Sequence, residues 1–267
     1  MRASSKGETA GMKRILEGRT ALVSGASRGI GLAIARRLAA DGARVMLVAR
    51  SAPVLEAEAA ALPGAATFAA DLARPEAAGQ AVEAAVAAFG RLDLLVHSAG
   101  ATRRGDFLTL PDEAWEDGYA LKLLGGMRLC RAAWPHLVAA GGAAVLIAGI
   151  GGRLASADFA IGGSVNAALI NLTKALADRG VRDGVRVNAI NPGSIRTDRL
   201  TGRIDTLARE RGIGTEAAAA ALAAESGIAR FGEPEEIAAA VAFLAGPDAS
   251  YVQGSILDVD GGWLRAV

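Results

Sequence analysis

The sequence contains little cysteine, histidine or aromatic side chain, and these shortages exclude several kinds of site. Its single cysteine, Cys130, cannot form a disulfide within the chain and is expected to be a small buried side chain. The two histidines, His97 and His136, lie far apart in the sequence and give no spacing typical of a metal site. We therefore expect neither a disulfide framework nor a bound metal.

Long apolar runs and an excess of one charge are also missing. No apolar run approaches the roughly 20 residues that a membrane span needs, and the net charge is only +1. Neither nucleic acid nor a membrane is an expected partner, and the expected location is the cytoplasm. Residues 1–17 are mostly polar and lack the apolar stretch of a secretory signal. We expect them to form a disordered tail before a single domain over residues 18–267.

What the sequence does contain is a regular alternation of short apolar runs and longer helical segments. Runs that are apolar on both faces, separated by amphipathic helices, are typical of a parallel sheet covered by helices. We therefore expect an α/β fold with a Rossmann-type, doubly wound parallel sheet of seven strands. The expected strands are 20–24, 44–49, 66–70, 92–97, 143–148, 185–190 and 255–259, and the main expected helices are 31–40, 76–89, 114–139, 164–178 and 235–245.

Two stretches that follow strand ends, 149–163 and about 197–231, have an irregular pattern. We expect them to form the walls of a substrate cleft. Ligands of open parallel sheets bind beyond the carboxyl ends of the strands, which is where both stretches lie. The second stretch predicts a pair of helices and is the expected substrate loop. Its four arginines either attract an acidic substrate or form a solvated helix face, and the pattern leaves both open. They are Arg199, Arg203, Arg209 and Arg211.

The first strand runs into a glycine-rich turn that opens a helix. Gly25, Gly29 and Gly31 allow a sharp turn and a close approach of the backbone to a pyrophosphate. The free N–H groups at the start of the helix then favour the phosphate charge. The alternative is an ordinary tight turn, but the strand and helix on either side favour a dinucleotide site.

The end of the second strand favours NADP over NAD. An acidic residue there would bind the ribose 2′-hydroxyl of NAD, and this sequence has Ala49 and Arg50 instead. Arg50 and Arg28 are suited to a 2′-phosphate, unless both are solvated surface residues. Asp71, at the end of the third strand, is placed either to accept a bond from the adenine amino group or to cap a helix.

The spacing Gly25-x-x-x-Gly29-x-Gly31 resembles that of the short-chain dehydrogenase/reductase superfamily, and segments 93–100, 186–193, 232–238 and 258–262 resemble other motifs of that family. The resemblance spans about residues 17–267 and implies a small-molecule substrate. It also implies a homotetramer or homodimer, with one interface formed by segments 114–139 and 164–178. The residues it assigns to the cofactor are Gly25, Ser27, Arg28, Gly29, Ile30, Gly31, Arg50, Asp71, Leu72, Ala99, Gly100, Asn166, Pro192, Gly193, Ile195 and Thr197.

The same resemblance fails at the catalytic positions. The family's serine falls on Gly149 and its tyrosine, which protonates the carbonyl oxygen, falls on Gly162. Its lysine falls on Asn166, and the asparagine of a neighbouring helix falls on Lys122. We expect Lys122 to bring a positive charge, with a lowered pKa, into the space that the missing lysine leaves. The alternative is a solvated helix lysine, with Asn166 alone holding the nicotinamide ribose.

Other polar residues near the cleft are weaker candidates. His97 has a suitable pKa for proton transfer but is more typical of hydrogen-bonded structure. Tyr119 lies one turn before Lys122, where an aromatic residue at a helix interface is the simpler interpretation. Ser156, Asp158 and Ser164 flank the missing tyrosine, where loop solvation or capping is the simpler role.

Two functions remain open. The first is an NADP-dependent oxidoreductase with a rebuilt proton donor, in which Lys122 and Asn166 are the candidate catalytic residues. The retained nicotinamide segment, Pro192 to Thr197, favours it because hydride transfer depends chiefly on position. The second is a dinucleotide-binding protein without turnover, acting as a subunit or redox sensor. The loss of the serine, tyrosine and lysine together favours this reading.

Overall fold

The computed structural model describes residues 14–265, and these form one parallel seven-stranded sheet in the order β3-β2-β1-β4-β5-β6-β7. This confirms the expected Rossmann-type sheet. Strand order reverses between β1 and β4, so the carboxyl ends of these two strands flank the position where such sheets bind ligands. The strands are β1 (Thr20–Ser24), β2 (Arg44–Ala49), β3 (Ala66–Ala69), β4 (Leu94–His97), β5 (Ala143–Ile147), β6 (Arg186–Pro192) and β7 (Ile256–Val259).

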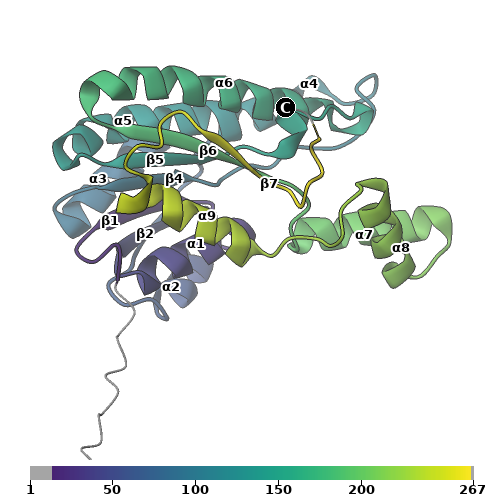
Figure 1. Cartoon of the computed structure of the whole chain (residues 1–267), viewed down its shortest axis with the longest axis horizontal. Coiled ribbons are helices and arrows are strands. Elements are labelled where there is room, and N and C mark those ends of the chain that lie inside the picture. The colour runs from purple at the N-terminus through teal and green to yellow at the C-terminus, as the bar shows by residue number, and fades with distance from the viewer. Residues whose placement is uncertain (1–13, 266–267) are drawn as a thin grey trace, which may run out of the picture.

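Helices cover both faces of the sheet (Figure 1). One face carries α1, α2 and α9, and the other carries α3, α5 and α6. The helices are α1 (Gly29–Ala40), α2 (Ala52–Ala59), α3 (Ala77–Phe89), α4 (Asp112–Gly118), α5 (Gly125–Ala140), α6 (Ala160–Asp183), α7 (Asp198–Arg211), α8 (Thr215–Glu225) and α9 (Pro234–Ala245). Shorter segments are the π-helix η1 (Tyr119–Leu124) and the 3₁₀ turns η2 (Ile150–Gly152), η3 (Ala157–Phe159) and η4 (Pro247–Ala249).

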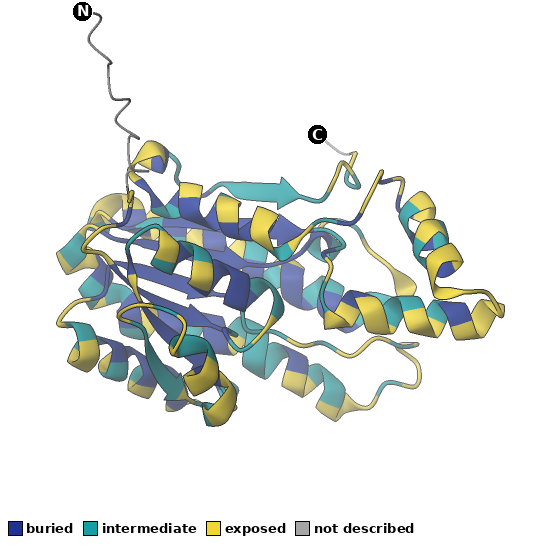
Figure 2. Cartoon of the chain, turned by 90° about the horizontal axis from the view of Figure 1, so that it is seen from below, coloured by how far each residue is buried: buried dark blue, intermediate teal, exposed yellow. Residues whose placement is uncertain are grey.

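The core consists of two apolar layers, one on each face of the sheet. Every residue of β1 and of β5 is buried, which is what a central parallel strand requires. Figure 2 shows the central strands as the buried part of the molecule, whereas the edge strands β3 and β7 are only partly buried. This rigid centre holds the carboxyl ends of β1, β4, β5 and β6 in fixed positions, and the candidate site is built there.

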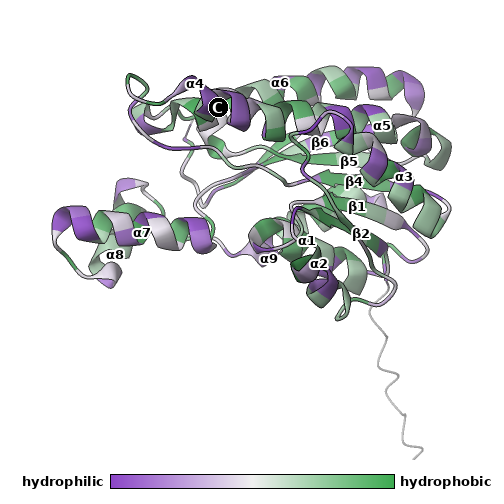
Figure 3. Ribbon diagram, turned by 180° about the vertical axis from the view of Figure 1, so that it is seen from behind, coloured by the Kyte–Doolittle hydropathy of each residue, from purple (hydrophilic) through white to green (hydrophobic). Residues whose placement is uncertain are grey.

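Helices α7 and α8 extend away from the sheet and its covering helices (Figures 1 and 3). They are the helix pair expected within 197–231. Their apolar side chains pack mainly on one another and on the following loop, in a small cluster that contains Leu200, Leu222, Ile228 and Phe231. The pair therefore has its own small core, separate from the two layers of the sheet.

The structure corrects three expected boundaries. The helix expected over 114–139 is three pieces, because η1 interrupts it between α4 and α5. Helix α6 begins at Ala160, inside the stretch expected to be irregular up to residue 163. Leu16 is buried and its N–H donates to the carbonyl of Asp41, so the packed domain includes residues that were expected in the tail. The rest of that predicted tail, residues 1–13, lies outside the described residues. No described helix is long and apolar enough to cross a membrane.

Candidate active site

The glycine-rich turn between β1 and α1 depends on the absence of side chains. Gly25 has a φ of 71°, and a Cβ there would lie 2.8 Å from the backbone nitrogen of Ala99. A Cβ on Gly31 would collide with the carbonyl of Gly25. The first turn of α1 has no side-chain cap, so its N–H groups are available to a ligand. A pyrophosphate fits such a turn, because both the close approach and the free donors are present.

The segment after β6 lies directly against this turn. A Cβ on Gly29 would lie 3.3 Å from the Cγ2 atom of Thr197, the residue before α7. Arg28 donates to Asp198 at 3.3 Å, which joins the same two segments through an exposed ion pair. The fold therefore brings the predicted adenine-end and nicotinamide-end residues to one edge of the sheet.

The residues expected at the adenosine end lie around the ends of β2 and β3. Arg28 and Arg50 are exposed, and Ser27 is half-buried beside them in the turn. A carboxylate oxygen of Asp71 accepts the N–H of Ala73 at 3.1 Å, so this residue also stabilises its own loop. Leu72 is buried beneath it.

Lys122 reaches toward Asn166 across the space between η1 and α6. Its Nζ donates to the Oδ1 of Asn166 at 2.6 Å and to the carbonyl of Ala148 at 2.5 Å. Burial, together with the positive charge of Arg199, lowers the pKa of Lys122 from 10.5 to about 7. The Lys122 ammonium therefore lies beside the side-chain amide of Asn166, where the resemblance predicts a lysine. With a pKa of about 7, Lys122 gains or loses a proton near neutral pH.

A buried histidine holds the backbone of Lys122. The hydroxyl of Ser24 accepts the N–H groups of Ser98 (3.1 Å) and Ala99 (3.2 Å), so its own hydrogen points to Nδ1 of His97 at 2.9 Å. The Nε2–H of His97 then donates to the carbonyl of Lys122 at 2.9 Å. Burial lowers the pKa of His97 to about 4, which keeps the ring neutral in this arrangement. Its contacts are those of a positioning residue.

Two glycines at the start of α5 permit this close packing. A Cβ on Gly126 would lie 2.7 Å from the His97 ring, and one on Gly125 would lie 2.8 Å from the carbonyl of Leu72. Without side chains at these positions, η1 and α5 approach the end of β4. The π-helix η1 carries Lys122 and directly precedes these glycines, and π-helical turns are frequent at functional sites.

Neighbouring side chains lie directly against Gly149 and Gly162, the two glycines at which the resemblance predicts a serine and a tyrosine. A Cβ on Gly149 would lie 2.8 Å from Nδ2 of Asn166. A Cβ on Gly162 would overlap the ring of Phe159, which immediately precedes α6. The space beside these two glycines is therefore occupied by an amide and an aromatic ring.

The loop between β4 and α4 covers this ring. The guanidinium of Arg104 stacks on Phe159 at 4.0 Å from the ring centroid and pairs with Asp158 at 2.7 Å. The N–H of Gly105 donates to the carbonyl of Asp158 at 3.0 Å. Ser156 also bonds the Asp158 carboxylate. These contacts hold the loop against η3 and explain Asp158 and Ser156 as structural residues.

The sequence did not predict Phe159, Arg104 or the carbonyl of Ala148 as parts of the candidate site. The available signal was the run of glycines at 149, 151, 152, 162 and 163, which indicates close approach of other atoms without saying which. Of the remaining candidates, the Ser164 hydroxyl bonds the carbonyl of Ile161 within α6. Tyr119 is half-buried at the start of η1.

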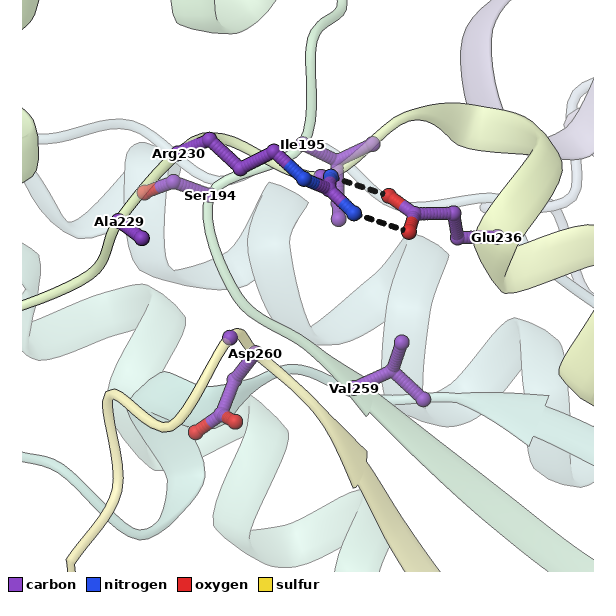
Figure 4. A pocket seen from close by; sticks show the side chains of 9 residues that line it. Ser194, Ile195, Ala229, Arg230, Glu236, Val259 and Asp260 are labelled. Carbon is purple, nitrogen blue, oxygen red and sulfur yellow. Dashed lines mark hydrogen bonds and ion pairs between the residues drawn. The ribbon is translucent and has the colours of Figure 1, made fainter.

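A separate cavity of about 200 Å³ lies beside the segment after β6 (Figure 4). Ser194 and Ile195 line one part of it and Asp260 another, and Arg230 and Glu236 form an ion pair at 2.7 Å at its edge. Neither Lys122 nor Asn166 contributes to this cavity. Of the predicted cofactor residues, Ile195 lines this cavity.

Comparison with known proteins identifies the family of this chain. Residues 25–264 match the family model described as enoyl-(acyl carrier protein) reductase. The chain is 35% identical over 249 residues to the 3-oxoacyl-(acyl-carrier-protein) reductase FabG of Vibrio cholerae, covering 92% of this chain and 98% of that protein.

Solved structures of oxidoreductases are also similar to this chain. L-sorbose reductase from Gluconobacter frateurii, complexed with NADPH and L-sorbose, is 34% identical with a TM-score of 0.91, covering 96% of this chain and 100% of that one. A short-chain dehydrogenase from Burkholderia cenocepacia in complex with NADP is 33% identical with a TM-score of 0.82, covering 93% and 99%. The chain therefore belongs to the family of the enoyl-(acyl carrier protein) reductase model and, with it, to the short-chain dehydrogenase/reductase superfamily of oxidoreductases.

Proposed function

We propose that the protein is an NADP-dependent oxidoreductase that interconverts a carbonyl compound and an alcohol, with Lys122 in place of the family's tyrosine as the proton donor. The observation that carries the proposal is the pair of hydrogen bonds from Lys122 Nζ to Asn166 and Ala148, which fix an ionisable group beside the nicotinamide end of the cleft.

The cofactor assignment rests on the turn and on the relatives. The glycine-rich turn has room for a pyrophosphate, and Arg28 and Arg50 are exposed cations suited to a 2′-phosphate. The solved relatives are described with NADPH or NADP. When bound, NADPH supplies the hydride. The protein's part is to hold the substrate carbon in position and to neutralise the oxygen.

The neutralising proton comes from Lys122. During reduction the carbonyl carbon gains the hydride, the C–O double bond becomes single, and the oxygen takes a proton from the Nζ ammonium. Lys122 is left as a neutral amine, which Asn166 and the carbonyl of Ala148 hold in place until it regains a proton from water. With a pKa of about 7, Lys122 is protonated on the acid side of neutrality and not on the alkaline side. Reduction should therefore slow as the pH rises through 7, and alcohol oxidation should accelerate.

The test is Lys122→Met, which keeps most of the stem and removes the charge. We expect carbonyl reduction by NADPH to fall by roughly 10²–10⁴-fold and the rate change around pH 7 to disappear. The measurement is NADPH oxidation across a panel of ketones, sugars and acetoacetyl thioesters. Lys174→Met, at an exposed lysine on α6, is the matched control and should leave both quantities unchanged. Unaltered turnover in Lys122→Met would remove Lys122 from the reaction.

A second function, dinucleotide binding without turnover, is favoured by one observation. The Phe159 ring lies where a Cβ on Gly162 would project, and the resemblance predicts the family's tyrosine, the usual acid, at that position. On this alternative the wild-type protein binds NADPH but oxidises it with no member of the panel. Fluorescence titration of NADPH and NADH, run beside the kinetic screen, separates the two functions.

A further inference from the structure

The side chain of Lys122 has two neutral hydrogen-bond acceptors and no carboxylate partner. Its Nζ donates to the carbonyl of Ala148 at 2.5 Å and to the side-chain oxygen of Asn166 at 2.6 Å. Within residues 14–265, no carboxylate forms an ion pair with this ammonium. A buried ammonium is normally stabilised by an opposite charge, which the described residues do not supply here. These surroundings therefore favour the neutral amine over the ammonium.

The stem of Lys122 is held in place by the chain around it. A Cβ on Gly100 would lie 2.8 Å from Cδ of Lys122, so the stem passes directly over this glycine. The carbonyl of the same glycine accepts a hydrogen bond from Arg199, which brings a positive charge from α7 to the segment after β4. From β4, the His97 ring bonds the backbone carbonyl of Lys122 and is itself neutral. From α6, Asn166 contributes an uncharged amide. The charge that faces Lys122 is therefore that of a second cation.

Two acceptors match the two N–H groups of a neutral amine. When the ammonium loses its third proton, both hydrogen bonds can remain, and the lone pair takes the fourth tetrahedral position of Nζ, directed away from both oxygens. Burial and the charge of Arg199 both favour that loss near neutral pH. Lys122 is half-buried, so the residue retains access to solvent. A lysine with an available lone pair that its neighbours hold in one direction is suited to attack a carbonyl carbon.

We infer that Lys122 is also a nucleophile, which forms an imine with a small aldehyde. The Nζ lone pair forms a bond to the carbonyl carbon, and the electrons of the C–O double bond move to the oxygen. The oxygen takes a proton from water and the nitrogen returns one, which gives a carbinolamine. Its hydroxyl group then leaves as water together with the second proton of the nitrogen, and a C–N double bond remains. Amine and aldehyde thus give imine and water. This inference goes beyond the proposed function, because it requires neither NADPH nor hydride transfer.

The experiment is reductive trapping of the intact protein with propanal and sodium cyanoborohydride at pH 7, without NADPH. Cyanoborohydride adds hydride to the imine carbon and converts the adduct into a stable secondary amine, which digestion and mass spectrometry then locate. The chain has only three other lysines, Lys6, Lys13 and Lys174. We expect Lys122 to be labelled at least about tenfold faster than the exposed Lys174, because a lysine in water, with a pKa of about 10.4, is almost wholly ammonium at pH 7.

Asn166→Asp tests the cause of this reactivity, because it keeps the size and one acceptor oxygen of the side chain while adding the negative charge that Lys122 lacks. The ammonium is then favoured, and labelling of Lys122 at pH 7 should slow by roughly tenfold or more. Asn171→Asp is the matched control, because Asn171 is exposed on the same helix. It should leave the labelling of Lys122 unchanged. The comparison of Lys122 with Lys174 in the wild type needs no variant and decides the matter if Asn166→Asp does not fold.

Two results would overturn the inference. They are labelling of Lys122 that is no faster than that of Lys174, or equal labelling of Lys122 in the wild type and in folded Asn166→Asp. Failure of the proposed function is a separate outcome. Fast trapping at Lys122 in a protein that oxidises NADPH with no carbonyl compound would keep the nucleophile and exclude the reductase. Turnover that Lys122→Met abolishes, without trapping at Lys122, would keep the proton donor and exclude the nucleophile.

Discussion

At the scale of single residues, the candidate site contains two groups whose protonation depends on burial. His97 is neutral because the interior excludes its charged form, and Lys122 has lost much of its preference for the charged form for the same reason. The two are connected, since the His97 ring bonds the Lys122 carbonyl. The positive charge of Lys122 is also one of the causes that lower the pKa of His97.

We expect His97 to make the fold sensitive to acid. Its pKa is about 4 in the folded chain against 6.5 for the free side chain, so the unfolded chain binds more protons between these values. The stabilisation is complete above pH 6.5 and is lost as the pH falls toward 4, by roughly 3 kcal/mol. Urea unfolding at pH 7 and pH 4.5 should show a smaller acid-dependent loss in His97→Gln than in the wild type. His136→Gln, on α5, is the control, and an equal loss in all three proteins would contradict the prediction.

At the scale of elements, the start of α6 is defined by the packing of the Phe159 ring against Gly162. Alanine normally replaces glycine in a helix with a gain of up to about 1 kcal/mol. At Gly162 the added methyl group would overlap the Phe159 ring, so Gly162→Ala should instead destabilise the protein by about 1–3 kcal/mol.

The control for this prediction is Gly79→Ala in α3, where a Cβ would meet no atom within 4 Å and the substitution should stabilise. Adding Phe159→Ala to Gly162→Ala should cost less than the sum of the two single changes, as contact between the residues requires. The measurement is the free energy of unfolding of the four proteins. Additive effects would show that the ring does not occupy that place.

The elements also show how far the sequence determines the site. Periodicity and the glycine spacing predict the parallel sheet and the dinucleotide turn, because these follow from burial on both faces and from local backbone geometry. The π-helix could not be read from 114–139, because periodicity within that segment does not show its contact with the distant His97 ring. The expectation that Lys122 enters the cleft agrees with its contact with Asn166, and its catalytic role stays a prediction.

At the scale of the whole molecule, the helix pair α7–α8 is set apart from the sheet. Its small apolar cluster is separate from the two main core layers, so its free energy of local opening should be lower than that of β1 or β5. We expect the amides of α7 and α8 to exchange hydrogen faster than those of the central strands. NADPH should slow exchange in α7, because Thr197 lies against the glycine-rich turn. Equal protection across the chain, measured by mass spectrometry, would contradict this.

Assembly belongs to the same scale. Val138 on α5 and Val181 on α6 are exposed apolar side chains on the helices expected to form a subunit interface. The homotetramer or homodimer stays a prediction, which sedimentation of the intact chain would test.

The glycines of the cleft also constrain the order in which such a site can arise by mutation. Gly100, Gly149 and Gly162 each face a larger side chain that would collide with a Cβ: Lys122, Asn166 and Phe159 respectively. A serine at 149 or a tyrosine at 162 would bring its Cβ against Asn166 or Phe159, so we expect either restoration to need a change in the neighbouring side chain as well.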